Sequence, residues 1–186
     1  MAVTMTNLIM GPATLYSGVF GAAEPTDATV TAAPATSAWT DAGGTLGGLK
    51  FLINQTYTPL NVDQVVDVAG RRLTARDIQV QTSMAEATLQ NLALALNGGT
   101  VVTAAGQNTY DPAAAISATQ PAYNALLFDG WGPNQFRRRV IVRKVLSTAS
   151  VDMEYAEATQ SVLAVTWGAH YVSAAITPFH IVDSNS

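Results

Sequence analysis

The feature of this sequence that most constrains its fold is a period of two in hydrophobicity, which recurs between turn-forming residues. Between residues 49 and 58, Leu49, Phe51, Ile53 and Tyr57 fall on one face, and the other face is largely polar. Successive side chains of a β-strand point to opposite sides, so this alternation predicts a strand with one face toward a core. Leu52 falls on the other face, so partial cover of both faces is the alternative. We therefore expect the chain to be built mainly from strands.

Further segments with strand-like composition lie on both sides of this run, and clusters rich in Gly, Pro, Asn or Asp separate many of them. The predicted strands cover residues 13–20, 49–58, 62–68, 73–81, 123–128, 136–146, 160–171 and 179–183. Seven or eight strands in 186 residues predict an antiparallel β-sandwich or barrel, folded as a single domain over residues 1–186.

One segment has a helical pattern instead. Ser83 with Glu86 three residues later matches a capping box, in which each side chain accepts a free backbone N–H of the first turn. An apolar stripe at helical spacing follows from Ala85 to Leu96, and the sequence 97–99, Asn-Gly-Gly, predicts the end of the helix. We expect one amphipathic helix of about three to four turns, packed on the sheet.

Two stretches are expected to lack regular structure. Residues 21–38 are rich in Ala, Thr and Pro and predict an extended connection, part of an N-terminal arm over about residues 1–38. Residues 98–122 are rich in Ala, Thr, Gly and Asn and predict a long, partly irregular loop. Loops of that length in compact domains are usually functional or disordered.

Charged residues make up only 12% of the chain, about half the usual share of a soluble domain. The net charge of −4 argues against broad binding to nucleic-acid phosphates, which depends on clustered Lys and Arg. The absence of Cys excludes thiol nucleophiles, Cys-type zinc sites and disulfides. Residues 1–23 are uncharged but lack the basic start of a signal peptide, so we expect no targeting segment and no membrane association.

Signatures of catalysis are weak. His170 and His180 lie in separate strand-like segments and form no metal-binding motif. Ser17 lacks the first Gly of a nucleophile elbow, and the glycines of residues 43–48 are not followed by the Lys of a phosphate loop. We therefore expect no enzyme activity, metal or cofactor.

Three carboxylates stand close together at Asp152, Glu154 and Glu157. Carboxylates this close together could divide the roles of general acid and general base. They lie in a polar linker between strands, however, so a solvated or interfacial face is the favoured interpretation. An enzyme would need a pocket that gathers Glu154, Glu157 and His170.

The basic residues are concentrated in one predicted strand, which places charges on both of its faces. Nucleic-acid binding favours a single basic face, so pairing with carboxylates across strands or across subunits is the better interpretation. The same applies to the arginines around the turn at Gly70. These basic residues are Arg71, Arg72, Arg76, Arg137, Arg138, Arg139, Arg143 and Lys144.

Five short stretches of the sequence indicate a resemblance to a known family through their order and spacing along the chain. They are residues 11–16 with 21–25 (GPATLY, GAAEP), 39–45 (WTDAGGT), 48–51 (GLKF) running to 62–64 (VDQ), 83–89 (SMAEATL), and Trp167 to 179–181 (FHI). Together they resemble the major tail tube proteins of long-tailed bacteriophages with flexible, non-contractile tails.

The resemblance implies a β-sandwich or barrel with one flanking helix, assembled as hexameric rings that stack into a tube. The implied partners are further copies of the chain, a tape measure protein, distal tail and tail terminator proteins, and double-stranded DNA that passes through the lumen without specific binding. The implied location is the virion tail, and the host cytoplasm during assembly.

On this basis, loops and arms supply the candidate contacts between subunits or rings. These contacts are Glu24, Pro25, Thr58, Pro59, Arg71, Arg72, Arg138, Arg139 and Asp111, and the candidate lumen-lining residues are Asp63, Asp67 and Asp77. An acidic or weakly charged lining suits a lumen that must not adhere to DNA. Two rivals remain: another β-rich virion or secretion-tube subunit, such as a capsid decoration protein or a contractile-injection tube protein, and a β-barrel enzyme.

Overall fold

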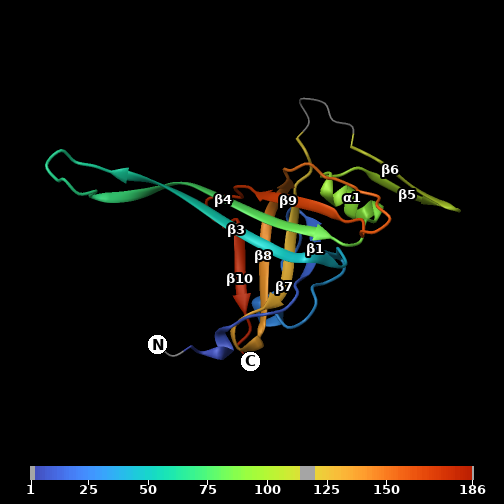
Figure 1. Cartoon of the computed structure of the whole chain (residues 1–186), viewed down its shortest axis with the longest axis horizontal. Coiled ribbons are helices and arrows are strands. Elements are labelled where there is room, and N and C mark those ends of the chain that lie inside the picture. Colours follow the sequence, from blue (N-terminus) through green and yellow to red (C-terminus); the bar gives the residue numbers. More distant parts are fainter. Residues whose placement is uncertain (1–2, 114–119, 186) are drawn as a thin grey trace.

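The computed structural model describes residues 3–113 and 120–185 (Figure 1). The fold is mainly β, with antiparallel strands and one α-helix, which confirms the predicted class of a β-sandwich with one flanking helix. The first layer has the order β2-β1-β7-β8 with β10 beside β8, and the second has the order β9-β4-β3. The strands are β1 (Thr14–Val19), β2 (Thr40–Asp41), β3 (Thr45–Leu60), β4 (Gly70–Met84), β7 (Asn124–Trp131), β8 (Arg137–Ser147), β9 (Leu163–Ala169) and β10 (Phe179–Asp183).

Strand β8 joins the two layers. Along one of its edges, the first half of β8 pairs with a strand of the first layer and the second half pairs with a strand of the second layer. Residues 138–142 pair with β10, and residues 145–147 pair with β9. The other edge of β8 pairs with β7 over nearly its whole length. The sheet therefore divides at Arg143 and Lys144, and β9 leads into the second layer, which crosses β8 and β10 in Figure 1.

The main core lies between the two layers. Phe51 of β3 reaches across to Phe128 of β7 and Phe179 of β10, with ring centroids 5.9 and 5.3 Å apart. Burial of each large apolar side chain stabilises the fold by about 1.5–3 kcal/mol, so this cluster provides most of the driving force. Its buried members are Leu15, Ala42, Val80, Met84, Ala95, Leu126, Phe128, Val140, Val142, Val145, Leu163, Val165 and Trp167.

The opposite face of the first layer is covered by the chain's own N-terminal arm. Trp39 is buried against Ala125, Leu127 and Ile141, and its indole N–H donates to the carbonyl of Ala23 over 2.9 Å. Residues 21–38 thus fold back onto β7 and β8 and contain the short 3₁₀ helix Asp27–Thr29. The arm forms a second, smaller core with its own sheet.

The helix α1 (Leu89–Ala95) is shorter than predicted and begins later. Ser83 belongs to β4, where it pairs with Leu46, so the predicted capping box is wrong. Thr88 is the N-cap instead, and its hydroxyl accepts the N–H of Asn91 over 3.2 Å. The carboxylate of Glu86 accepts the N–H of Gly44 over 3.0 Å and therefore holds the turn before β3.

The predicted end of the helix is confirmed. Leu96 is the C-cap, and Asn97 follows with a positive φ of 59°. The Asn97 side chain then exchanges two hydrogen bonds with the backbone of Ser147, at 2.9 and 2.6 Å. These bonds fix the end of α1 to the end of β8.

Two expectations about loops are corrected. Residues 62–68 form no strand but the turn of a long hairpin between β3 and β4. Residues 98–122 are more regular than expected, because β5 (Thr100–Ala104) and β6 (Gln107–Asp111) pair as a separate hairpin. Residues 114–119 of this predicted loop lie outside the described part of the chain.

Candidate functional site

Among the described residues, the candidate catalytic groups Glu154, Glu157 and His170 do not line a common pocket at His170. No group of three or more His, Cys, Asp or Glu within residues 3–113 and 120–185 has a geometry suited to a metal ion. His180 faces Asp27 at 3.1 Å, whereas the ring of His170 packs edge-on against Tyr123. His170 lines a pocket beside β4, and Glu154 and Glu157 are not among the residues that line it.

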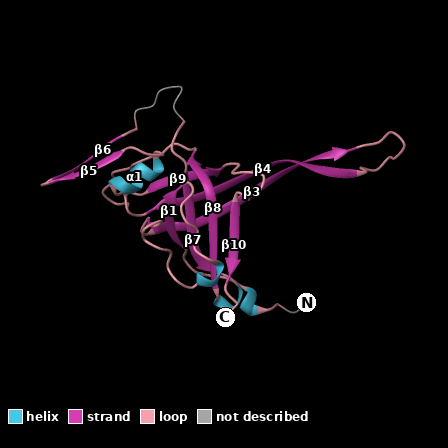
Figure 2. Ribbon diagram, turned by 180° about the vertical axis from the view of Figure 1, so that it is seen from behind, coloured by secondary structure: helices cyan, strands magenta, loops and turns pink. Residues whose placement is uncertain are grey.

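The most distinctive feature is the long hairpin of β3 and β4. Strand β9 pairs with β4 only over residues 79–84, so residues 53–60 and 70–78 pair only with each other. Figures 1 and 2 show this distal part extending well beyond the layered body. An isolated two-stranded hairpin is marginally stable in water, so a projecting one of this length is expected to have a partner.

The strand register shows which side chains share a face of the hairpin. Phe51, Ile53 and Tyr57 alternate onto the face that packs in the core nearer the body, as predicted from the sequence. A register shift between Thr56 and Tyr57 places Leu73 opposite Tyr57 and so keeps an apolar residue of β4 on this same face. The core-facing side of the sheet therefore continues past the edge of the core.

Beyond the body, this face is largely exposed, although Leu73 and Arg76 line a pocket that the segment from His170 to Pro178 borders. Ile53 is 40% exposed and Tyr57 is 48% exposed, and Leu73 beside them is also exposed. Arg71 and Arg76 share the face, since they pair with Pro59 and Gln55 of β3. We call these five residues, Ile53, Tyr57, Arg71, Leu73 and Arg76, the hairpin face.

The predicted contacts near the hairpin have different positions on it. Thr58 and Pro59 lie on β3 near the turn, and Arg72 points to the face opposite Arg71 and Arg76. No ion pair of these arginines is found among the described residues. Their charges are available to another molecule.

The three predicted lumen-lining residues lie at two different places on the hairpin. Asp63 and Asp67 lie in the exposed turn of the hairpin, whereas Asp77 is on the outer face of β4. The Asp77 carboxylate accepts the amide of Gln79 over 2.8 Å, and Gln79 accepts the amide of Gln81 over 3.2 Å. The expectation of one acidic strand at residues 62–68 is wrong, because that segment is a turn.

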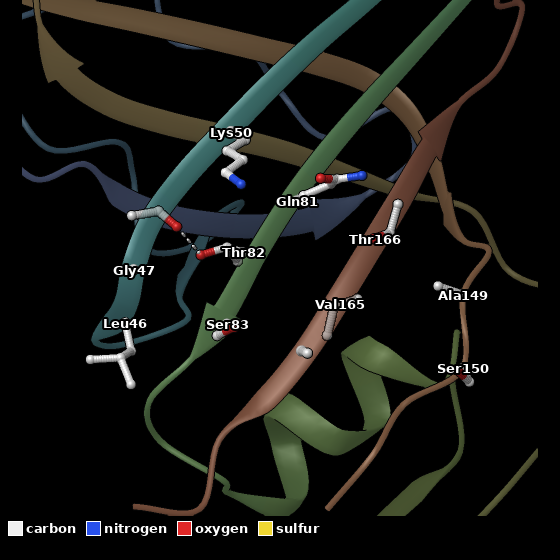
Figure 3. Close-up of a pocket in the computed structure, with 12 residues that line it drawn as sticks. Leu46, Gly47, Lys50, Gln81, Thr82, Ser83, Ala149, Ser150, Val165 and Thr166 are labelled. Carbon is white, nitrogen blue, oxygen red and sulfur yellow. Dashed lines mark hydrogen bonds between the residues drawn. The ribbon is translucent and has the colours of Figure 1, made fainter.

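The outer face of the second layer is polar and has little charge. Lys50, Gln81 and Thr166 lie side by side on β3, β4 and β9 and line a shallow depression (Figure 3). Beneath them, the hydroxyl of Thr82 donates to the carbonyl of Gly48 over 2.9 Å. This surface offers hydrogen-bonding groups without a strong electrostatic field.

Three of the four arginines of β8 pair with carboxylates of the chain, and two of these pairs, Arg138 with Asp183 and Arg139 with Asp129, run across strands as predicted, whereas Arg137 lies over the ring of Trp131. Arg139 is 1% exposed and makes two hydrogen bonds of 2.7 Å to Asp129, its register partner on β7. Its guanidinium also donates to the carbonyls of Thr29 and Ala32 in the arm. Arg139 therefore has no surface to offer another copy, which corrects the expectation that it is a subunit contact.

Arg138 and Arg143 are paired nearer the surface. Arg138 makes hydrogen bonds of 2.6 and 2.7 Å to Asp183 of β10, and this bond lowers the pKa of the Asp183 carboxyl and raises that of Arg138. Arg143 binds Glu24 of the arm at 2.6 and 2.9 Å. The predicted contacts Arg138 and Glu24 thus hold intramolecular pairs, although both remain partly exposed.

The remaining predicted contacts lie elsewhere on the surface. Pro25 is half-buried in the arm, and Asp111 is exposed at the end of β6. The structure does not gather the predicted contact residues at one place. They fall on the arm, the hairpin, the first layer and the β5–β6 hairpin.

The connection between β8 and β9, residues 148–162, forms a surface that sequence reasoning described only as solvated or interfacial. Asp152, Glu154 and Glu157 are exposed on it, and Met153 and Tyr155 alternate with them, Tyr155 being 84% exposed. We call these five residues the acidic loop. The alternation of charged and large apolar residues over 152–155 is the sequence signal by which Met153 and Tyr155 could have been added to this surface.

Among the described residues, none of the helices is both long enough and apolar enough to cross a membrane. No known family model matches the chain, and no curated protein matches it significantly.

Proposed function

We propose that this chain is a structural subunit of the tail tube of a long-tailed bacteriophage. Copies form hexameric rings that stack around a tape measure protein, and the resulting tube conducts double-stranded DNA during ejection. The ends of the tube are bound by distal tail and tail terminator proteins. The protein needs no cofactor and acts in the virion after assembly in the host cytoplasm.

The observation that carries this proposal is the projecting β3–β4 hairpin. Its core-facing side continues beyond the body with exposed Ile53, Tyr57 and Leu73, and large apolar side chains grouped in this way mark an interaction surface. The hairpin is suited to reach a neighbouring copy.

The free edge of β3 supports the same conclusion. β3 is the last strand of its sheet, and its 16 residues carry one charged side chain, Lys50. Long uncharged edges are templates for pairing with another chain, and closure of strands into a ring removes them by symmetry. Pairing of β3 with the next subunit would join the second layers of a ring into one continuous sheet.

The outer face of the second layer has the properties expected of the lumen wall. Between Lys50 and Asp77, which are opposite charges, this surface is built from groups such as Gln79, Gln81 and Thr166. Arg72 lies on the same side of the sheet, farther out along the hairpin. Such a surface neither attracts phosphates strongly nor repels them, so DNA slides past it. In this arrangement Asp77 lines the lumen, and Asp63 and Asp67 lie at the hairpin turn.

The test is assembly of the purified full chain, followed by sedimentation and negative-stain electron microscopy at increasing protein concentration. We expect hollow rings or tubes. A variant in which residues 55–76 are removed and Asn54 is joined to Asp77 through an Asn-Gly turn is the matched comparison. It keeps the pairs of Phe51 with Phe128 and Phe179, so it should fold with a similar melting temperature and remain a monomer.

A full chain that stays monomeric at high concentration, also with tail initiator proteins present, would overturn the proposal. Flat shell patches instead of hollow stacks would favour a capsid decoration protein. Assembly of the truncated variant at the concentration that suffices for the full chain would show that the hairpin is not the contact.

A further inference from the structure

The hairpin face has a definite chemistry. Two arginines, Arg71 and Arg76, share it with Ile53, Tyr57 and Leu73. Neither guanidinium has an ion pair within residues 3–113 and 120–185. A surface that binds here must supply both carboxylates and apolar side chains, because burying an arginine without a partner is costly.

The acidic loop offers that combination on the same chain. Asp152, Glu154 and Glu157 make no ion pair among the described residues, and Met153 and Tyr155 stand exposed between them. Arg138, Arg139 and Arg143, in contrast, already hold carboxylates of their own. The arginines of the hairpin face and the carboxylates of the acidic loop therefore have opposite charges and no ion pair among the described residues, whereas Asp63, Asp67 and Asp77 of the hairpin lie in its turn or on its other face.

The acidic loop is fixed to the body at both ends. Val151 packs against the main core, and the side-chain amide of Gln160 donates to the carbonyl of Ala85 over 3.1 Å. The hydroxyl of Ser161 donates to the carbonyl of Glu154 within the loop. These anchors present the acidic residues at a defined place, so little ordering entropy opposes docking.

The two surfaces lie at a distance from each other in the molecule. In Figures 1 and 2 the hairpin turn extends to one side, and the connection from β8 to β9 runs beside α1 toward the other side. One chain cannot bring its own hairpin face onto its own acidic loop. A contact between different patches on two identical copies is head-to-tail, which produces rings or helical stacks.

We propose that the hairpin face of one copy docks on the acidic loop of a second copy, with Arg71 and Arg76 facing Glu154 and Glu157. Ile53, Tyr57 and Leu73 then cover Met153 and Tyr155. This inference rests on the proposed function, since it identifies the two surfaces through which tube subunits meet.

The experiment uses two charge-reversed full-length proteins. The first carries Arg71→Glu and Arg76→Glu, and the second carries Glu154→Arg and Glu157→Arg. Each alone brings like charges together, so we expect the concentration for half-maximal assembly to rise by at least about tenfold in sedimentation and light scattering. An equimolar mixture restores opposite charges at every contact and should assemble as the wild type does.

Arg72→Glu is the matched control, because Arg72 lies on the other face of the same strand. It changes the net charge by the same amount per residue and should leave assembly within about twofold of the wild type. Circular dichroism and thermal melting show that each variant is folded.

The outcomes separate the two proposals. If the wild type forms tubes and the reversed proteins assemble equally well, or if the mixture fails like its components, the docking inference is wrong and the tail tube proposal stands. If the wild type itself does not assemble, the proposed function fails and the inference fails with it.

Discussion

Arg139 links three parts of the chain that are distant in sequence. Its guanidinium binds Asp129 of β7 and the carbonyls of Thr29 and Ala32, so it fastens the N-terminal arm to the first layer. Both members of the ion pair are buried, at 1% and 6% side-chain exposure. The four hydrogen bonds compensate the loss of hydration that burial imposes on the charge.

We expect Asp129→Ala to lower the free energy of unfolding by about 3–5 kcal/mol, because it leaves the Arg139 charge buried without a partner. Urea unfolding measured by circular dichroism tests this. Asp183→Ala is the comparison, since it breaks the exposed Arg138 pair and should cost no more than about 1 kcal/mol. Equal losses in the two variants would contradict a special role for the buried pair.

Among the elements, α1 shows how a local signal is overridden by strand pairing. The sequence at residues 83–84 is compatible with the start of a helix. In the structure these two residues instead pair with β3 and β9 as the last residues of β4. Met84 is fully buried in that position. The chain gains more from burying it in the sheet than from one early turn of helix, so the cap moves to Thr88.

Thr88→Ala should destabilise the protein by about 1 kcal/mol, because it removes the hydroxyl that accepts the N–H of Asn91. Ser83→Ala should change stability by less than about 0.5 kcal/mol, since Ser83 caps no helix. Chemical unfolding of the two variants side by side distinguishes the positions. A larger effect at Ser83 would support the capping box instead.

At the scale of the whole molecule, the packing of the body and the exposure of the hairpin differ sharply. The body holds its two layers together through a continuous core, and the arm completes the other side. The distal hairpin is held mainly by its own backbone ladder and by exposed side-chain hydrogen bonds such as that from Thr74 to the carbonyl of Thr56. Segments with few buried apolar contacts open at low free-energy cost, so the hairpin should be the more dynamic part of a free subunit.

Amide hydrogen exchange should show this difference directly. In dilute protein we expect rapid exchange over residues 53–60 and 70–77 and slow exchange in β7 and β8, which lie in the core. After assembly, the distal hairpin and residues 152–157 should become protected together, while β7 and β8 change little. Strong protection of the distal hairpin in the monomer would contradict the idea that it needs a partner.

The sequence predicted the character of the arginine strand but not its partners. The alternating charges of residues 137–144 indicated cross-strand pairing, and Asp129 and Asp183 are strand neighbours in register with Arg139 and Arg138. Glu24 lies 119 residues from Arg143, a separation that no local pattern reveals. Which carboxylate meets which arginine was therefore decided by the order of strands in the sheet.

By itself the sequence determined the mainly β character, the single helix and its end, and the two faces of β3, because side-chain periodicity and turn residues act over a few positions. Only the tertiary structure decided that residues 21–38 pack on their own sheet, that Arg139 is buried, and that the core-facing side of β3 and β4 extends past the core. These outcomes depend on which distant segments become neighbours, and on where those neighbours stop. The exposed hairpin face exists because β9 ends its pairing at Gln79 while β3 and β4 continue.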